Sequence, residues 1–333
     1  MKTSKLKLAA LASAILMSAA TGSAHAGAYA LSSNNIQNFT ITQSPGNLIT
    51  FGASTDTSGA TAALNGVNAG GPGVPGTSDA PIAALGTPVV TNNGQFTATG
   101  INPVGVTATS YSYADALITH VTPNVFNAQT IAESNLASTG TAGGSSTNSS
   151  ATGFVANIVV NQPGGMIDFA FTADPLIRTF LQPESGKIAQ GTLSASLTIS
   201  CAAASGCGTD ARGNAIGLGA VVFAWAPDGV ADGASGVTGR IGGNELADAE
   251  NLNLSVTNDV IFTGGGSLNF SDTGVSLGVF HAVTNAMNVG TYTLTLAMTS
   301  TDATTNVVPE PGTIGLLGLG LDGVALSTRR RKA

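Results

Sequence analysis

Apolar and polar residues alternate in a series of short stretches along the chain. A two-residue period places apolar side chains on one face of an extended strand and polar ones on the other. Glycine, asparagine, aspartate and proline separate the stretches and favour turns. The pattern predicts an all-β protein, an antiparallel β-sandwich or jelly roll. The expected strands cover residues 36–42, 154–160, 166–171, 193–200, 220–225, 252–256, 274–280 and 292–299.

Other segments lack this alternation. Residues 52–86 and 137–153 are rich in Ala, Gly, Ser, Thr and Asn, and we expect both to be long loops. Residues 115–120 and 244–250 are each expected to hold a helical turn or two. Asn244 is a favourable residue to cap the second of these helices.

The beginning of the chain has the three parts of a secretory signal. Lys2, Lys5 and Lys7 precede an apolar run at residues 8–20, which is too short to span a bilayer. Ala24-His25-Ala26 then matches an A-x-A cleavage site, so Ala24 and Ala26 are the expected recognition residues. We expect the Sec machinery to export the chain and residues 1–26 to be removed.

The charge between residues 27 and 308 is strongly acidic. Four basic residues (Arg178, Lys187, Arg212 and Arg240) stand against 16 acidic residues there, which gives a formal charge of −12. Such a surface repels the phosphates of nucleic acids and of anionic lipids. We therefore expect no nucleic-acid partner.

The sequence contains two cysteines, Cys201 and Cys207. Export to an oxidising compartment favours a disulfide that pins a short turn. The alternative is a redox or metal-binding pair. The C-x5-C spacing differs from the C-x-x-C of redox sites and from zinc-ligand spacing, and no histidine is near.

The search for catalytic residues gives no convincing set. Apart from the signal, the histidines are His120 and His281, and no H-E-x-x-H or P-loop lysine motif occurs. We expect both histidines to be structural or surface residues, because a Ser-His-Asp triad needs a base beside an activated nucleophile. The sequence thus predicts no catalytic residues and a protein that is not an enzyme.

Two groups of residues are candidates for binding. Asp228, Asp232, Glu245 and Asp248 lie in one acidic region, and loop carboxylates are calcium ligands. The EF-hand pattern is not met, so a solvated acidic loop is the plainer interpretation and calcium a weaker one; no other cofactor is expected. Trp225 is expected in the core rather than as a sugar-stacking platform. The tyrosines at 111 and 113 should share one strand face.

The end of the chain has its own pattern. Pro309-Glu310-Pro311 precedes a Gly- and Leu-rich span at residues 312–328, long enough for about 25 Å of helix. Arg329, Arg330, Arg331 and Lys332 follow and would stop the helix at the cytoplasmic side of a membrane. Asp322 within the span weakens such a transmembrane helix. A permanent anchor and a buried helix of the domain are the alternatives.

Pro-Glu-Pro, an apolar span and an arginine cluster, in this order, resemble the PEP-CTERM sorting signal. The resemblance implies recognition by an exosortase, a membrane-embedded cysteine protease-transpeptidase of Gram-negative bacteria, and cleavage at or near Pro309-Glu310-Pro311. It also implies brief anchoring in the inner membrane before passage to the cell surface or the exopolysaccharide matrix. The stretch AYALSSNNIQNFTIT after the signal also resembles exosortase-dependent surface proteins, more loosely.

These observations divide the chain into a signal (1–26), an extracytoplasmic β-domain (27–305) and a sorting signal (306–333). The function they favour is that of an exported structural protein of the cell surface or exopolysaccharide matrix. The alternatives are an extracellular module that binds carbohydrate, calcium or ice and, third, a secreted hydrolase.

Overall fold

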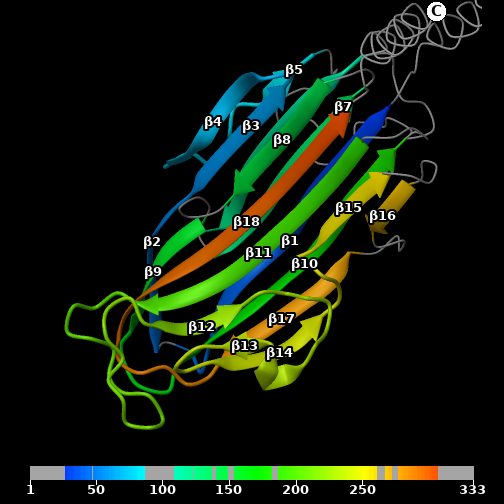
Figure 1. Ribbon diagram of the computed structural model, residues 1–333. Helices are drawn as coiled ribbons and strands as arrows, with labels where there is room; N and C mark the ends of the chain where they lie inside the picture. Colours follow the sequence, from blue (N-terminus) through cyan, green and yellow to red (C-terminus); the bar gives the residue numbers. More distant parts are fainter. Residues whose placement is uncertain are drawn as a thin grey trace, which may run out of the picture.

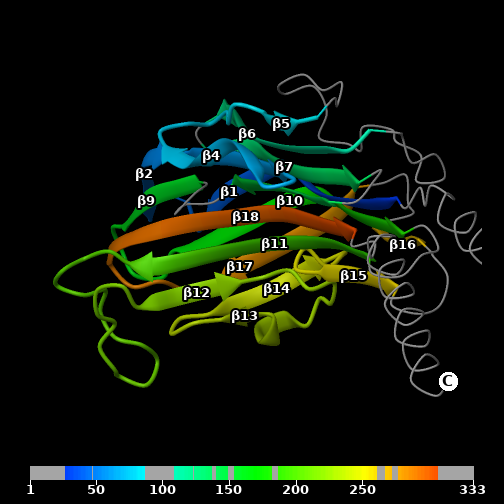
Figure 2. The same cartoon turned by 45° about the horizontal axis from the view of Figure 1, so that its top comes forward.

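The structure is a computed structural model that describes residues 27–46, 48–86, 109–122, 124–136, 140–148, 154–181, 187–260, 267–271 and 277–306. Two antiparallel sheets face each other in these ranges and form a β-sandwich (Figures 1 and 2). The one helical element in the same ranges is a 3-10 turn, η1 (Gly233–Ser235). The predicted all-β fold is therefore confirmed.

The first sheet has the strand order β14-β17-β10-β1-β7-β6-β5, and β16 also pairs with β10. β17 pairs with β10 up to Ala173 and β16 pairs with it from Leu176, so Pro175 lies between the two partners. Proline has no N–H to donate and is tolerated at such a gap. The strands are β1 (Ala28–Ser44), β5 (Ala83–Leu85), β6 (Tyr111–Thr122), β7 (Val125–Leu136), β10 (Met166–Leu181), β14 (Gly243–Asp248), β16 (Ser267–Ser271) and β17 (Gly278–Thr284).

The second sheet has the order β13-β12-β11-β18-β8-β3-β4. β15 also pairs with β11, β9 pairs with the first half of β18, and β2 pairs with β9. The strands are β2 (Ile49–Thr55), β3 (Thr57–Leu64), β4 (Val67–Pro75), β8 (Gly140–Asn148), β9 (Phe154–Val160), β11 (Lys187–Cys201), β12 (Val221–Trp225), β13 (Val237–Thr238), β15 (Ser255–Val260) and β18 (Gly290–Asn306).

β1 and β18 are long interior strands of opposite sheets, and they define two ends of the sandwich. We call the end where β1 begins and β18 finishes the tail end, and the opposite end the disulfide end. Ala28 pairs with Leu181, the last residue of β10, and Asn306 pairs with Lys187, the first residue of β11. Because β11 follows β10 after a short connection, the start of β1 and the end of β18 lie at the same end of the sandwich. The dark blue start of β1 and the orange-red end of β18 accordingly lie together in Figure 1. Since β18 has 17 residues, the two ends lie about 50 Å apart at ~3.3 Å per residue.

Aromatic rings fill the interior of the disulfide end. The ring of Phe39 lies 4.8 Å from that of Phe126 and 5.3 Å from that of Phe171. Phe171 also stacks on Phe280 at 4.8 Å. The buried cluster around these rings includes Phe154, Phe169, Phe223, Trp225 and Tyr292. We call this part of the sandwich the aromatic half.

Small residues fill most of the interior of the tail end, apart from a small cluster around Leu136 and Leu181. Along β7 the inward side chains change from Phe126 to Ala128, Thr130, Ala132 and Ser134. Along β18 they change from Tyr292, Leu294, Leu296 and Met298 to Ser300, Asp302 and Thr304. An added Cβ at Gly191 would lie 2.7 Å from Ile177 Cγ2, which shows that the two sheets approach closely here. We call this part the small-residue half.

The predicted strands at 36–42, 154–160, 166–171, 193–200 and 292–299 are confirmed within β1, β9, β10, β11 and β18. The stretch 220–225 corresponds to β12, which begins one residue later. The remaining two are only partly right. β15 begins at Ser255 rather than at 252, and β17 begins at Gly278, while residues 274–276 lie outside the described residues.

Two predicted loops are largely wrong. Residues 52–86 form most of β2 and all of β3, β4 and β5, and residues 140–148 of the second expected loop form β8. Ala60 and Ala62 of β3 pack against Ala114 and Ala116 of β6. The side chains of these strands are small because the facing sheet is close, so their sequence resembles a loop.

Both predicted helices are also wrong. Residues 115–120 lie in β6, where they continue the ladder with β7. Residues 244–248 lie in β14, paired with β17. Glu245 and Asp248 of this stretch are buried on the strand, as described below.

The expected borders of the domain can be compared with the strands at its ends. β18 continues to Asn306, one residue beyond the predicted border at 305. The expected membrane helix at 312–328 lies outside the described residues. No helix within the described ranges is long and apolar enough to cross a membrane.

Candidate functional site

The acidic region predicted as a calcium site connects the two sheets at one side of the sandwich. After β12 the chain passes through η1, adds β13 at the edge of the second sheet, and then enters the first sheet as β14. Glu245 and Asp248 are buried, with 4% and 7% of their surface exposed, whereas Asp228 and Asp232 are exposed. The four residues therefore do not form one solvated loop.

A β-bulge brings Glu245 and Asp248 to the same side of β14. Residues three apart on a regular strand point to opposite faces. In β14 the register with β17 shifts between Glu245 and Ala247, and the extra residue, Leu246, is exposed. An extra residue on one strand reverses the alternation after it, so Asp248 turns inward beside Glu245.

Glu245 joins the core to the loop above it. Its Oε1 accepts a hydrogen bond from the indole Nε1–H of Trp225, and its Oε2 accepts one from the Asp232 backbone N–H at 3.3 Å. A Cβ at Gly236 would overlap Oε2, so only glycine fits at this position. Burial raises the pKa of Glu245 to about 7, and the nearby carboxylate of Asp248 adds to the rise.

Asp248 holds the start of the same loop. Its Oδ2 accepts backbone hydrogen bonds from Asp228 at 2.7 Å and Gly229 at 3.0 Å. Its Oδ1 is buried and has no hydrogen-bond partner among the described residues. Burial also raises the pKa of Asp248. The two carboxyl groups thus fasten the loop to β14, and we call this pair the carboxyl clasp.

A pocket of about 270 Å³ lies beside the carboxyl clasp. Its lining includes Asp228, Asp232, Glu245, Ser196 and Thr198. No three His, Cys, Asp or Glu side chains in the described part of the chain are arranged to hold a metal ion. The carboxylates are turned to N–H donors instead, and calcium binding stays a prediction.

The two histidines are paired with aspartates. His120 Nε2 lies 2.9 Å from both carboxylate oxygens of Asp56, and its ring packs near Phe126 and Phe154. His281 Nε2 lies 2.9 Å from Asp168 Oδ2. A triad would also need an activated nucleophile beside the imidazole, and the structural role of both histidines stays a prediction.

A string with nucleophile-elbow spacing also occurs at residues 274–278, around Ser276. A nucleophile elbow stands on a turn from a strand into a helix. Here residues 274–276 lie outside the described residues, and Gly278 begins the strand β17. The element that follows is therefore the wrong one for an elbow.

The aromatic candidates are buried. Trp225 is 2% exposed and its ring lies 5.6 Å from that of Phe171, which confirms it as a core residue. Tyr111 and Tyr113 share one face of β6, as predicted, and are buried. The Tyr111 hydroxyl donates to Glu133 Oε1 at 3.0 Å, and the Tyr29 hydroxyl donates to the same atom at 2.8 Å. Sequence reasoning missed Glu133, because strand pairing alone brings these three residues together.

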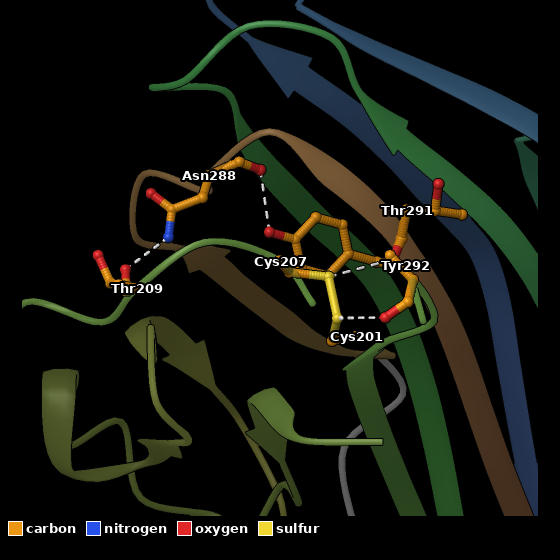
Figure 3. Close-up of a disulfide and its surroundings, with 7 residues drawn as sticks. Cys201, Cys207, Thr209, Asn288, Thr291 and Tyr292 are labelled. Atoms are coloured by element: carbon orange, nitrogen blue, oxygen red, sulfur yellow. Dashed lines mark hydrogen bonds between the residues drawn. A yellow bond between two sulfur atoms is a disulfide. The ribbon is translucent and has the colours of Figure 1, made fainter. Parts of the chain in front are cut away.

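The predicted disulfide between Cys201 and Cys207 is present (Figure 3). It ties the last residue of β11 to a loop that returns at Ala220, where the Cys201 N–H donates to the Ala220 carbonyl at 2.9 Å. Tyr292 and Asn288 support it from the start of β18. The Tyr292 hydroxyl donates to the Asn288 carbonyl at 2.9 Å, and Asn288 Nδ2 donates to the Thr209 carbonyl at 2.7 Å.

The tip of this loop is an exposed turn. Asp210 Oδ1 accepts backbone hydrogen bonds from Asn214 at 2.8 Å and Arg212 at 2.9 Å. The Asn214 N–H is the main reason that the pKa of Asp210 is lowered. The turn lies at the disulfide end, far from the tail end, and β11 joins it to the rest of the sheet.

The remaining predicted residues lie outside the described ranges. These are Ala24 and Ala26 of the signal, Pro309, Glu310 and Pro311 of the triplet, and Arg329, Arg330, Arg331 and Lys332. For this part of the chain the comparison with known families is informative. Residues 307–332 match the family model of the PEP-CTERM protein-sorting motif.

The match covers a small part of the chain and begins directly after β18. No curated protein and no solved structure matched the chain. A PEP-CTERM motif implies processing by an exosortase and export to the cell surface. The sequence at residues 307–332 thus confirms the predicted sorting signal, and the chain is an exported protein with a PEP-CTERM motif.

Proposed function

We propose that this chain is a non-enzymatic structural protein of the cell surface or exopolysaccharide matrix of a Gram-negative bacterium. The sorting motif at residues 307–332 carries the proposal, because it assigns the chain a route and a processing enzyme. The Sec machinery exports the precursor, the apolar tail holds it briefly in the inner membrane, and exosortase removes the tail. The sandwich is then left outside the membrane.

The body of the chain supports a structural role. Its polar clusters are used within the fold: the carboxyl clasp holds a loop, Glu133 binds two tyrosines, and each histidine binds an aspartate. The strong negative charge between residues 27 and 308 keeps such domains apart in solution. A rigid, acidic sandwich with a disulfide suits a crowded extracellular layer, with exopolysaccharide as its neighbour.

The first test follows the tail in a host that has an exosortase. An epitope is best placed between Arg212 and Gly213, in the exposed turn at the disulfide end. The intended comparison is wild type with Glu310→Ala, and Thr313→Ala is the matched control outside the triplet. We expect wild type and control to lose the tail by intact mass and to leave the membrane fraction. The mutant should keep both.

Three results would contradict this proposal. If all three proteins kept the tail in the membrane, the span would be a permanent anchor. If the processed protein bound calcium in calorimetry, or a defined glycan on an array, the body would be a binding module instead. Hydrolysis of a matrix polymer that is lost in His120→Ala or His281→Ala would favour the hydrolase.

A further inference from the structure

The sorting motif follows the last strand without a linker. Asn306, the last residue of β18, is paired on both sides, with Lys187 of β11 and Gly140 of β8. The motif begins at the next residue, and only Val307 and Val308 precede Pro309. Two extended residues span at most about 7 Å. A membrane-embedded protease that acts at the triplet therefore meets a paired strand of the folded sheet almost immediately.

The interior beside this strand end combines polar pairs with only a small apolar cluster, in which Leu136 and Leu181 pack with three alanines. The Ser32 hydroxyl donates to the Thr301 carbonyl at 2.7 Å. The hydroxyls of Thr130 and Ser300 lie 2.7 Å apart. Such pairs replace hydrogen bonds to water and contribute about 1 kcal/mol each. Burying a large apolar side chain contributes about 1.5–3 kcal/mol.

A buried polar side chain further lowers the stability of the same place. Asn34 is fully buried on β1, yet both polar atoms of its amide lack a partner among the described residues. A buried polar group without a partner costs about 1–3 kcal/mol. The end of β18 also borders an open pocket of about 460 Å³, which Thr301 and Asp302 line together with residues of β3 and β4.

The first half of β18 is different. Tyr292, Leu294 and Leu296 are buried in the aromatic cluster, and the disulfide fixes the neighbouring end of β11. Local opening takes less free energy where few apolar contacts are lost. The tail end of β18 should therefore open far more often than its beginning, although both halves are fully paired with their neighbours.

We propose that residues 300–306 detach from β8 and β11 to present Pro309-Glu310-Pro311 to the exosortase, and that this opening sets the rate of tail removal. The inference rests on the proposed function, because it concerns how the exosortase reaches the motif. The small-residue half is then a device for processing. It allows a complete sandwich to release its last residues without global unfolding.

The test changes the distance between strand and motif. A flexible Gly-Ser-Gly-Ser-Gly-Ser insertion between Asn306 and Val307 should increase the rate of tail loss about tenfold, because the enzyme no longer waits for local opening. The matched control carries the same insertion between Arg212 and Gly213 and should be processed like wild type. Rates are read by intact mass after a pulse of expression.

Hydrogen exchange gives a second measurement that needs no processing. In Glu310→Ala protein, which keeps its tail, the amides of residues 300–306 should exchange at least about tenfold faster than those of residues 291–297. Equal processing rates with and without the linker, or uniform protection along β18, would overturn the inference while leaving the proposed function intact. Retention of the tail in every variant would overturn the proposed function, and this inference with it.

Discussion

The aromatic half and the small-residue half share the same long strands but differ in what lies between the sheets. In the aromatic half, Phe39 contacts rings from β7 and β10. In the small-residue half, most facing side chains are alanine, serine, threonine and asparagine, the few large apolar ones include Leu136 and Leu181, and hydroxyl groups link the sheets by hydrogen bonds. The backbone hydrogen bonds between strands therefore continue through both halves, whereas the packing of large side chains between the sheets is largely confined to the aromatic half. Local stability should follow the interior side chains rather than the ladder of hydrogen bonds.

The largest loss of folding stability is expected from a substitution in the aromatic half. Phe39→Ala removes a ring that contacts Phe126 and Phe171, and a large-to-small change in a packed core costs about 3–5 kcal/mol. Ser134→Ala in the small-residue half should cost no more than about 1.5 kcal/mol, the value of one hydrogen bond. Urea denaturation of both variants measures the difference. Equal losses would show that the two halves are equally stable.

The carboxyl clasp, beside Trp225 at the edge of the aromatic half, should make stability depend on pH. Since burial raises the pKa of Glu245 from 4.5 to about 7, the folded protein binds a proton that the unfolded chain has released. Stability should fall as the pH rises from 4.5 to 7, by at most about 3 kcal/mol. The raised pKa of Asp248 acts in the same direction.

Glu245→Gln tests the pH effect, because glutamine can accept the indole hydrogen bond but cannot ionise. Urea midpoints at pH 5 and pH 8 should be closer together in this variant than in wild type. Asp232→Asn, at an exposed position of the same loop, is the control and should keep the wild-type difference. The same pH dependence in Glu245→Gln and wild type would assign the effect to other groups.

The disulfide should contribute less to folding stability than the aromatic rings beside it. Replacing both Cys201 and Cys207 by serine opens a loop with a sequence separation of 6. Closure of so short a loop stabilises by about 2 kcal/mol in the chain-entropy model. We expect a lower melting temperature and faster proteolysis at the exposed Arg212, measured with trypsin. An unchanged melting temperature would show that the hydrogen bonds of the loop suffice.

The smallest change in folding stability is expected from truncating a buried polar side chain that has no hydrogen-bond partner among the described residues. Asn34→Ala removes an amide that has no partner among the described residues. The desolvation cost that disappears and the side-chain packing that is lost have opposite signs, so stability should change by less than about 1 kcal/mol. Ile36→Ala, two residues along on the same face of β1, joins the apolar cluster and should cost about 2–5 kcal/mol. Similar losses for both variants would contradict the comparison between the halves.

The sequence predicted the aromatic half better than the small-residue half, for a physical reason. Alternation is visible where large apolar residues face inward, as in β9, in the second half of β11 and in the first half of β18. In β3 the inward residues are Ala60 and Ala62, and their neighbours Gly59, Thr61 and Ala63 are also small, so the two faces differ little in hydrophobicity. A close approach of two sheets requires small side chains, and these leave no hydrophobic contrast to detect.

The carboxyl clasp could not be predicted from spacing either. Glu245 and Asp248 are three residues apart, which suggests neighbouring turns of a helix or opposite faces of a strand. Only the bulge at Leu246 brings them together. The sorting motif is the reverse case. It is a linear signal that another protein recognises, so the sequence alone identifies its residues. The sequence did not predict that the motif directly follows a paired strand.

The place of β18 in the second sheet also has a consequence for biogenesis. It is the last strand in the chain, yet it lies between β11 on one side and β8 and β9 on the other. An exported chain emerges from its amino end, so these strands leave the translocation channel first. Until the final strand arrives, the second sheet is three fragments: β11 with β12, β13 and β15, β8 with β3 and β4, and β9 with β2. Their open edges attract other chains. These edges stay open until β18 inserts and joins the fragments, so the last strand to leave the channel completes the sheet.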